Sequence, residues 1–153
     1  MGEKRMVFIA LDKKKDHCRR AFDYYLDKVK RADDQVLLAH IVEPTGIPTP
    51  TLAHGVTRSR AEWDTIMRRM EETAREITAD YEKICEAENI PFQSIWGAGN
   101  AGEGICELAK NEGADFILIG NRGLGSIKRT LLGSVTDYVV QHSHVAVLIV
   151  PPK

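Results

Sequence analysis

The sequence predicts a single α/β domain over residues 1–153, with a doubly wound parallel sheet of five strands and helices on both faces. Two observations indicate this class: five short apolar runs, and segments of helical periodicity that separate them. A chain of this length buries roughly 68–70% of its unfolded surface, which is enough for one core without disulfides or metals. Strands joined through helices pair in parallel, by right-handed crossovers.

The first half of the chain contains two strands, a helix and a proline-rich loop. The continuous apolar runs at 6–11 and 36–42 are typical of strands buried on both faces. Between them, apolar residues at steps of three and one from Cys18 to Val29 predict a helix. Prolines in the segment 43–58 exclude regular structure there, and a loop of this length is a candidate lid.

Three further strands and three helices are predicted in the second half. The strands follow from apolar runs at 92–96, 116–119 and 145–150. Helical spacing from Trp63 to Cys85 predicts a long helix, whose Met and aromatic residues we assign to the core rather than to a cofactor site. Asn100 and Glu103 resemble a capping box that opens the next helix, and Gly113 ends that helix. The last helix is indicated by the spacing of Val135, Tyr138, Val139 and His142.

Composition and charge exclude several classes of protein. A net charge of −1, from 21 Lys+Arg and 22 Asp+Glu, gives no electrostatic footprint for nucleic acid or a membrane surface. No apolar run approaches the ~20 residues that span a bilayer, and the first residues lack the apolar stretch of a secretory signal. The three cysteines are scattered without metal-ligand spacing. We therefore expect a cytoplasmic protein with no metal site and no nucleic-acid or membrane partner.

A glycine-rich segment follows the fourth predicted strand, at a strand end where open α/β sheets bind ligands. Gly120 and Gly123 precede a spacer of nine residues, after which Gly133 and Ser134 open the last helix. Glycines let backbone N–H groups approach an anion, and a helix N-terminus adds unpaired donors and a favourable dipole. The segment therefore has the properties of a phosphate cradle in two halves. Taken singly, Ser134 is equally explained as an N-cap supported by Asp137, and the first two glycines as a tight turn.

The pattern Gly120-x2-Gly123-x9-Gly133-Ser134 resembles the nucleotide-binding signature of the universal stress protein family, in its ATP-binding branch. The resemblance runs nearly end to end, and the stretch 123–138 looks most like eukaryotic members. It implies a Rossmann-like fold that binds ATP, with any Mg²⁺ carried by the nucleotide. It also implies a stress-response protein that acts as a dimeric binding switch.

The resemblance further implies a set of contacts at matching positions. Asp12 and the backbone of Ile41 would face adenine, and Ala10 would line the base pocket. Ribose and phosphates would be held at the carboxyl end of the fourth strand and the start of the last helix, through backbone amides of Gly120, Gly123, Gly133 and Ser134, with Arg122, Val135 and Thr136 beside them. One departure from the family is the run of lysines at 13–15, where a small or hydroxylic residue is common.

Two other function classes are weighed against this interpretation. The segment 97–102 satisfies the dinucleotide fingerprint G-x-G-x-x-G, and Arg122 could imitate a partner for a 2′-phosphate, which would make the protein an NAD(P)-dependent oxidoreductase. However, this segment follows the third strand rather than the first, and no second mononucleotide-binding half follows. The other class is a dimeric interaction module that binds no nucleotide.

The sequence favours binding over catalysis. None of the five histidines is a convincing general base. His40 lies within a buried strand and His142 on an apolar helix face, as core residues do, and the other three, His17, His54 and His144, fall in or near loops and helix ends. We therefore expect at most slow ATP hydrolysis and name no catalytic residue. Association with another chain is predicted from a different observation. The apolar strand at 145–150 is placed at a sheet edge, and such edges pair with other chains. Similar family members pair this strand across a two-fold axis, which implies a homodimer.

Overall fold

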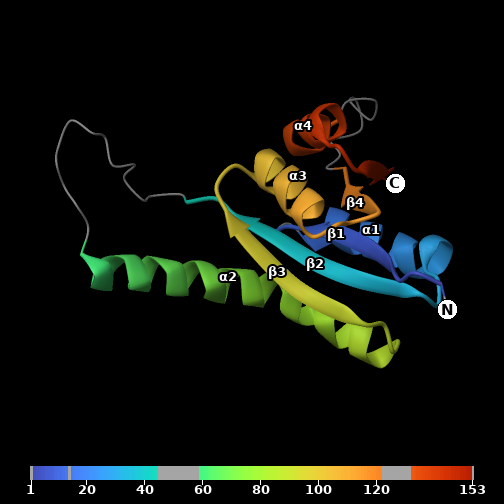
Figure 1. Cartoon of the computed structure of the whole chain (residues 1–153), viewed down its shortest axis with the longest axis horizontal. Coiled ribbons are helices and arrows are strands. Elements are labelled where there is room, and N and C mark those ends of the chain that lie inside the picture. The colour runs from blue at the N-terminus through green and yellow to red at the C-terminus, as the bar shows by residue number, and fades with distance from the viewer. Residues whose placement is uncertain (1, 14, 45–58, 122–131, 153) are drawn as a thin grey trace.

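The computed structural model describes residues 2–13, 15–44, 59–121 and 132–152 (Figure 1). The proline-rich loop at 45–58 and the spacer at 122–131 lie outside the described residues. The strands are β1 (Arg5–Leu11), β2 (Asp34–Val42), β3 (Phe92–Ala98), β4 (Phe116–Gly120) and β5 (Ala146–Val150). The helices are α1 (Lys15–Tyr24), which continues into a π-helical turn η1 (Tyr25–Val29), then α2 (Arg60–Ala87), α3 (Ala101–Asn111) and α4 (Ser134–His142).

The five strands form one sheet in the order β3-β2-β1-β4-β5, and every neighbouring pair is parallel. The predicted doubly wound fold is therefore confirmed. The order reverses between β1 and β4, because the chain moves outward through β2 and β3 and then crosses back to the other side of β1. The carboxyl ends of β1 and β4 diverge at this reversal, which is where ligands bind in open α/β sheets.

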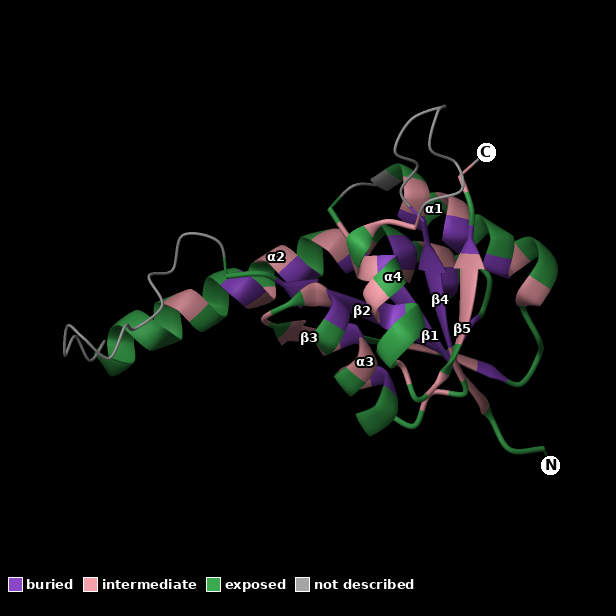
Figure 2. Cartoon of the chain, turned by 90° about the horizontal axis from the view of Figure 1, so that it is seen from above, coloured by how far each residue is buried: buried purple, intermediate pink, exposed green. Residues whose placement is uncertain are grey.

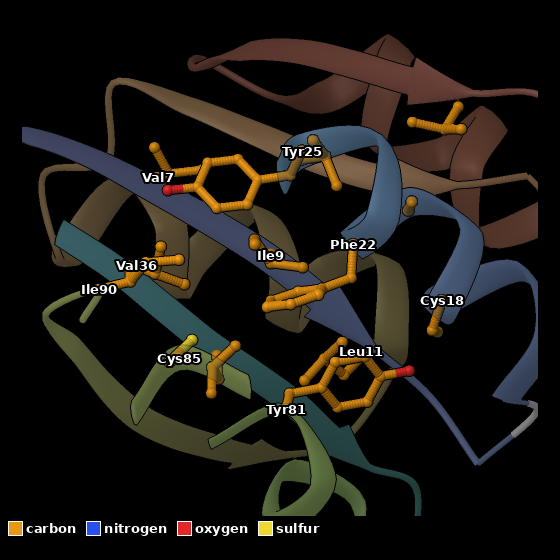
Figure 3. Packing of buried hydrophobic residues seen from close by; sticks show 14 residues of the cluster. Val7, Ile9, Leu11, Cys18, Phe22, Tyr25, Val36, Tyr81, Cys85 and Ile90 are labelled. Atoms are coloured by element: carbon orange, nitrogen blue, oxygen red, sulfur yellow. The ribbon is translucent and has the colours of Figure 1, made fainter. Parts of the chain in front are cut away.

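Alternate residues along β1 face opposite sides of the sheet and belong to two separate core clusters. Val7, Ile9 and Leu11 pack with the helices α1 and α2 on one face, and Phe22 forms an edge-to-face pair with Tyr81 there at 5.2 Å between ring centroids (Figure 3). On the opposite face, Phe8 and Ala10 pack in a cluster with residues of α3 and α4. Both faces of the central strand are thus covered, as its continuous apolar run predicted.

The N-terminal half of α2 corrects one prediction. Trp63 and Met67 were assigned to the core, but their exposed fractions are 44% and 48%, and Figure 2 shows this part of the helix projecting beyond the sheet. A helix of 28 residues is about 42 Å long, whereas the nine residues of β2 span about 30 Å, so the first turns of α2 have no strand beneath them. The buried stripe begins at Met70.

The helix ends agree with most of the predicted signals. The Asn100 side chain accepts a hydrogen bond from the N–H of Glu103 at 3.1 Å, and Gly113 follows the same helix with a φ of +67°. His142 was expected in the core, but it is exposed and stacks on Tyr138 with ring centroids 4.0 Å apart. Each step of three residues falls about 60° short of a full helical turn, so the inward face that includes Val139 no longer includes His142. No helix in the described part of the chain combines the length and apolarity needed to cross a membrane.

Candidate functional site

A cavity of about 420 Å³ opens at the carboxyl ends of β1, β2 and β4. It lies where the strand order reverses, and its far wall is the first turn of α4 together with the start of α3. Its volume lies within the range of about 300–1,000 Å³ that is usual for small-molecule sites. The described sheet therefore presents a ligand-sized cavity at the position that its topology favours.

The structure brings eight of the ten predicted site residues to this cavity. They lie at the ends of three strands and at the start of one helix, and they are Ala10, Asp12, Ile41, Gly120, Gly133, Ser134, Val135 and Thr136. The other two, Arg122 and Gly123, lie outside the described residues. Segments more than a hundred residues apart in the sequence thus meet around one space.

Sequence reasoning missed the remaining lining residues. They lie on the same strand ends and on the starts of α1 and α3, and they are Leu11, Lys13, His17, Cys18, His40, Val42, Glu43, Ala101, Ile105 and Ile119. A usable signal existed for several of them, because every residue that directly follows a parallel strand belongs to the same edge of the sheet. Glu43 directly follows β2, and Lys13 is the second residue after β1, and they add one carboxylate and one cation to the cavity.

Asp12 supplies an accessible carboxylate to the cavity. Its side chain is 33% exposed, and Oδ2 lies 3.8 Å from Nε2 of His17. Its backbone N–H donates to Sγ of Cys18 at 3.2 Å, which fixes the turn between β1 and α1. Burial raises the pKa of the Cys18 thiol to about 12, so this group is a neutral thiol rather than a nucleophilic thiolate.

His40 is a buried histidine that also lines the cavity. Its Nδ1–H donates to the carbonyl of Leu11 at 2.8 Å, so the prediction of a satisfied core histidine is confirmed. Burial lowers the pKa of His40, and the charge of Lys13 lowers it further, whereas the Leu11 carbonyl and Glu43 act in the opposite direction. The net shift is downward, so the imidazole is neutral at pH 7.

The N-terminus of α4 forms the polar end of the cavity. The N-cap residue is Gly133, so Ser134 is the first helical residue and the interpretation of Ser134 as the N-cap is wrong. The first intrahelical bond runs from the N–H of Asp137 to the carbonyl of Gly133 at 2.8 Å. The N–H groups before Asp137 therefore have no partner within the helix. Those of Ser134 and the two residues after it lie on cavity-lining positions and can donate to an anion.

The two described glycines of the signature differ in what the fold requires of them. A Cβ on Gly120 would collide with the backbone carbonyl oxygen of His17, so close packing of α1 on β4 requires glycine there. Gly133 has a φ of −62° and a ψ of 158°, which any residue adopts, and its Cβ would approach Oδ1 of Asn121 only to 3.7 Å. Among the described residues, nothing in the fold requires a glycine at Gly133, although it lines the cavity.

The fingerprint at 97–102 has a structural explanation instead. This segment begins at the end of β3, an edge strand separated from β4 by two other strands, and none of its three glycines lines the cavity. A Cβ on Gly102 would lie 2.7 Å from the ring of Tyr138, so this glycine allows α3 and α4 to pack closely. Gly99 has a φ of +127°, which favours glycine in the turn itself.

Comparison with known proteins decides the family. The universal stress protein family matches residues 5–151, almost the whole chain. The chain belongs to the universal stress protein family. Universal stress protein Slr1101 of Synechocystis is 40% identical over 67 residues, which are 44% of this chain and just over half (56%) of that relative. Universal stress protein MJ0577 of Methanocaldococcus jannaschii is 28% identical over 127 residues, 78% of each chain.

Solved universal stress proteins share the fold. One is a family member from Arabidopsis thaliana with AMP bound, which has a TM-score of 0.70 and 20% identity and covers 97% of this chain and 92% of that one. Another is a universal stress protein in complex with cAMP, with a TM-score of 0.58, 22% identity and coverage of 97% and 98%. At these identities the likeness establishes the architecture, and the ligands are properties of those two proteins.

Proposed function

We propose that this universal stress protein binds an adenine nucleotide, ATP, in the cavity between β1 and β4. The observation that carries the proposal is Gly133, a glycine that the described fold does not require, at the start of a helix whose first N–H groups line the cavity. A missing side chain at this position leaves room for phosphate groups to approach those donors. The two solved relatives that hold AMP and cAMP support an adenine nucleotide as the ligand.

The cavity has a suitable group for each part of the nucleotide. The carboxylate of Asp12 and the backbone of Ile41 would bind adenine, beside the small side chain of Ala10. The N–H groups of Ser134 and its two neighbours would bind phosphates, and any Mg²⁺ would arrive with the nucleotide. Arg122 and Gly123 lie outside the described residues and remain part of the proposed site.

We propose binding, and a role as a switch in the stress response, rather than turnover. Hydrolysis needs a group that positions or deprotonates water near the phosphates. Burial lowers the pKa of His40, which makes its imidazole a weak general base, and Cys18 stays a protonated thiol, which is a poor nucleophile. At most slow hydrolysis is expected.

Freshly purified protein is expected to release ATP or ADP on denaturation, and Mg-ATP is expected to raise its melting temperature. Ligand at 100 times its dissociation constant stabilises a protein by about 2.7 kcal/mol, which shifts the melting temperature of a chain of this size by about 5–10 °C. Ion-exchange chromatography of the supernatant and a melting curve provide the measurements. NADPH serves as the control, and a shift with NADPH alone would favour the oxidoreductase. No nucleotide and no shift would leave a dimeric interaction module as the better account.

We also propose a homodimer that forms through β5. This strand lies at the edge of the sheet, all five of its residues are apolar, and Ala146 is exposed. Unpaired strand edges of this kind pair with other chains. A two-fold axis beside β5 would extend the sheet across two copies and cover this edge.

Light scattering at micromolar concentration is expected to give twice the chain mass of 17.1 kDa. Ala146→Lys is expected to shift the protein to monomer, because a lysine on an edge strand opposes pairing. Val140→Lys is the matched control, because Val140 is an equally apolar, 43% exposed residue on α4 rather than on the edge. A monomeric wild-type protein, or a dimer that survives Ala146→Lys but not Val140→Lys, would contradict pairing through β5.

A further inference from the structure

Asn121 connects three elements at the polar end of the cavity. It directly follows β4 and is only 3% exposed. Its backbone N–H donates to the carbonyl of Val150 at 2.9 Å, which continues the pairing of β4 with β5. Its side-chain Oδ1 accepts the N–H of Gly133 at 2.9 Å, twelve residues later in the chain. The side chain of this one buried residue thus holds the start of α4 against the end of β4, and its backbone joins the same place to β5.

This contact changes which amides of α4 are available to a ligand. Gly133 has no side chain with which to cap the helix, and its own N–H is already donated to Asn121. The resemblance to the family implied a phosphate contact from that N–H. In this chain the amides left for phosphate begin one residue later, at Ser134, and their place is set by the bond that holds Gly133.

We infer that Asn121 is a positioning residue for the phosphate groups of the nucleotide, an inference that rests on the proposed function. Donors held in place before the ligand arrives lose less conformational freedom on binding, so the acceptor on Asn121 contributes to affinity without touching the ligand. Its contribution applies to the phosphates alone, because Asp12 and Ile41 at the adenine end are held by other contacts.

The test is the affinity for Mg-ATP and for adenosine, measured by isothermal titration calorimetry on the full chain. Asn121→Ala leaves the N–H of Gly133 without its acceptor and is expected to weaken ATP binding roughly tenfold. Adenosine lacks phosphates, so its affinity is expected to change by less than about twofold. A general loss of structure would weaken both ligands together. Should Asn121→Ala fail to fold, Asn121→Ser keeps a hydroxyl acceptor on a shorter side chain. Its ratio of ATP affinity to adenosine affinity should lie between the wild-type ratio and the roughly tenfold lower ratio expected for Asn121→Ala.

Asn100→Ala is the matched control. Asn100 makes the same kind of bond, from its side-chain oxygen to the N–H of Glu103, at the start of α3. Its loss is expected to lower the melting temperature and leave the ratio of ATP to adenosine affinity unchanged. An unchanged ratio in Asn121→Ala or Asn121→Ser, with ATP still bound, would overturn the positioning role alone. A wild-type protein that binds neither ligand would overturn the proposed function itself.

Discussion

Gly133→Val is expected to weaken ATP binding by at least about a hundredfold, which corresponds to about 2.7 kcal/mol. The branched side chain would occupy space beside the first turn of α4, and two charge-assisted hydrogen bonds to phosphate account for a loss of this size. The folded protein should tolerate the change, because the φ of −62° suits valine and the nearest described atom is 3.7 Å from the new Cβ. Calorimetry with Mg-ATP measures the affinity, and a melting curve without nucleotide measures the fold.

Replacing glycine at the N-cap carries its own small cost, so the melting temperature of Gly133→Val is expected to fall by at most about 4 °C. Gly133→Ala provides a graded control, with a smaller side chain and a smaller loss of ATP affinity. Adenosine binding should be retained in both variants. Wild-type ATP affinity in Gly133→Val would show that no ligand phosphate approaches α4, and it would remove the main support for the proposed site.

Gly120→Ala is expected to behave in the opposite way, although the signature contains both glycines. The added Cβ meets the backbone carbonyl of His17, which cannot move without shifting α1 against β4. Overpacking of this kind costs about 1–3 kcal/mol, so the melting temperature should fall clearly before any ligand is added. We therefore expect the Gly120 substitution to lower the stability of the fold and the Gly133 substitution to lower the affinity for ATP. A chemical denaturation curve without nucleotide, which measures stability alone, separates the two effects.

The fold could be predicted because its signals are local. Each strand is a short apolar run, and each helix carries its own periodicity and caps, as Asn100 and Gly113 show. The wrong predictions concerned the burial of particular helix residues, which depends on the length of the sheet and on the neighbouring elements rather than on the periodicity of the helix itself. An apolar stripe on α2 does not reveal that the sheet ends before Trp63, and the helical spacing around Tyr138 does not reveal how far α4 rotates before His142.

Part of the candidate site could also be predicted from local sequence signals. The topology placed the ligand, and the glycine signature after β4 identified Gly120, Gly133 and Ser134. The other five predicted residues that line the cavity came from the resemblance to the universal stress protein family. Asn121 could not be identified in this way. Its role depends on one contact to Gly133 across a twelve-residue separation, and no local pattern in the sequence indicates that contact.

Asp34 forms the densest polar cluster at the other end of the described sheet. Its carboxylate accepts hydrogen bonds from Nε and Nη2 of Arg5 at 2.6 and 2.8 Å, from the hydroxyl of Tyr25 at 2.9 Å and from the N–H of Arg31 at 2.9 Å. Nη2 of Arg5 also donates to the carbonyl of Val29 at 2.8 Å. The Asp34 side chain is 1% exposed and that of Arg5 16%. The starts of β1 and β2 are thereby joined to the end of η1.

Asp34→Ala is expected to lower the free energy of unfolding by about 3–5 kcal/mol, the usual cost of removing one partner from a buried ion pair. The loss removes the acceptor of the Tyr25 hydroxyl and the carboxylate partner of the Arg5 guanidinium, which keeps only its bond to the Val29 carbonyl. Urea denaturation monitored by circular dichroism gives the measurement. Asp23→Ala is the control, because Asp23 pairs with Arg19 on the surface, where both side chains are more than half exposed, and a pair of this kind contributes at most about 0.5 kcal/mol.

The same cluster predicts the acid sensitivity of the protein. Burial alone would raise the pKa of Asp34, but hydrogen bonds from Arg5, Arg31 and Tyr25, together with the charge of Arg5, lower it overall. Because the folded pKa lies below the unfolded value of about 3.9, the stabilisation is complete above that value and is lost as pH falls through the folded pKa. The stability gap between wild type and Asp34→Ala should therefore be constant near neutral pH and narrow below about pH 4. A gap that stays constant to pH 2 would show that the carboxylate charge contributes nothing to stability, and that only the packing of the side chain does.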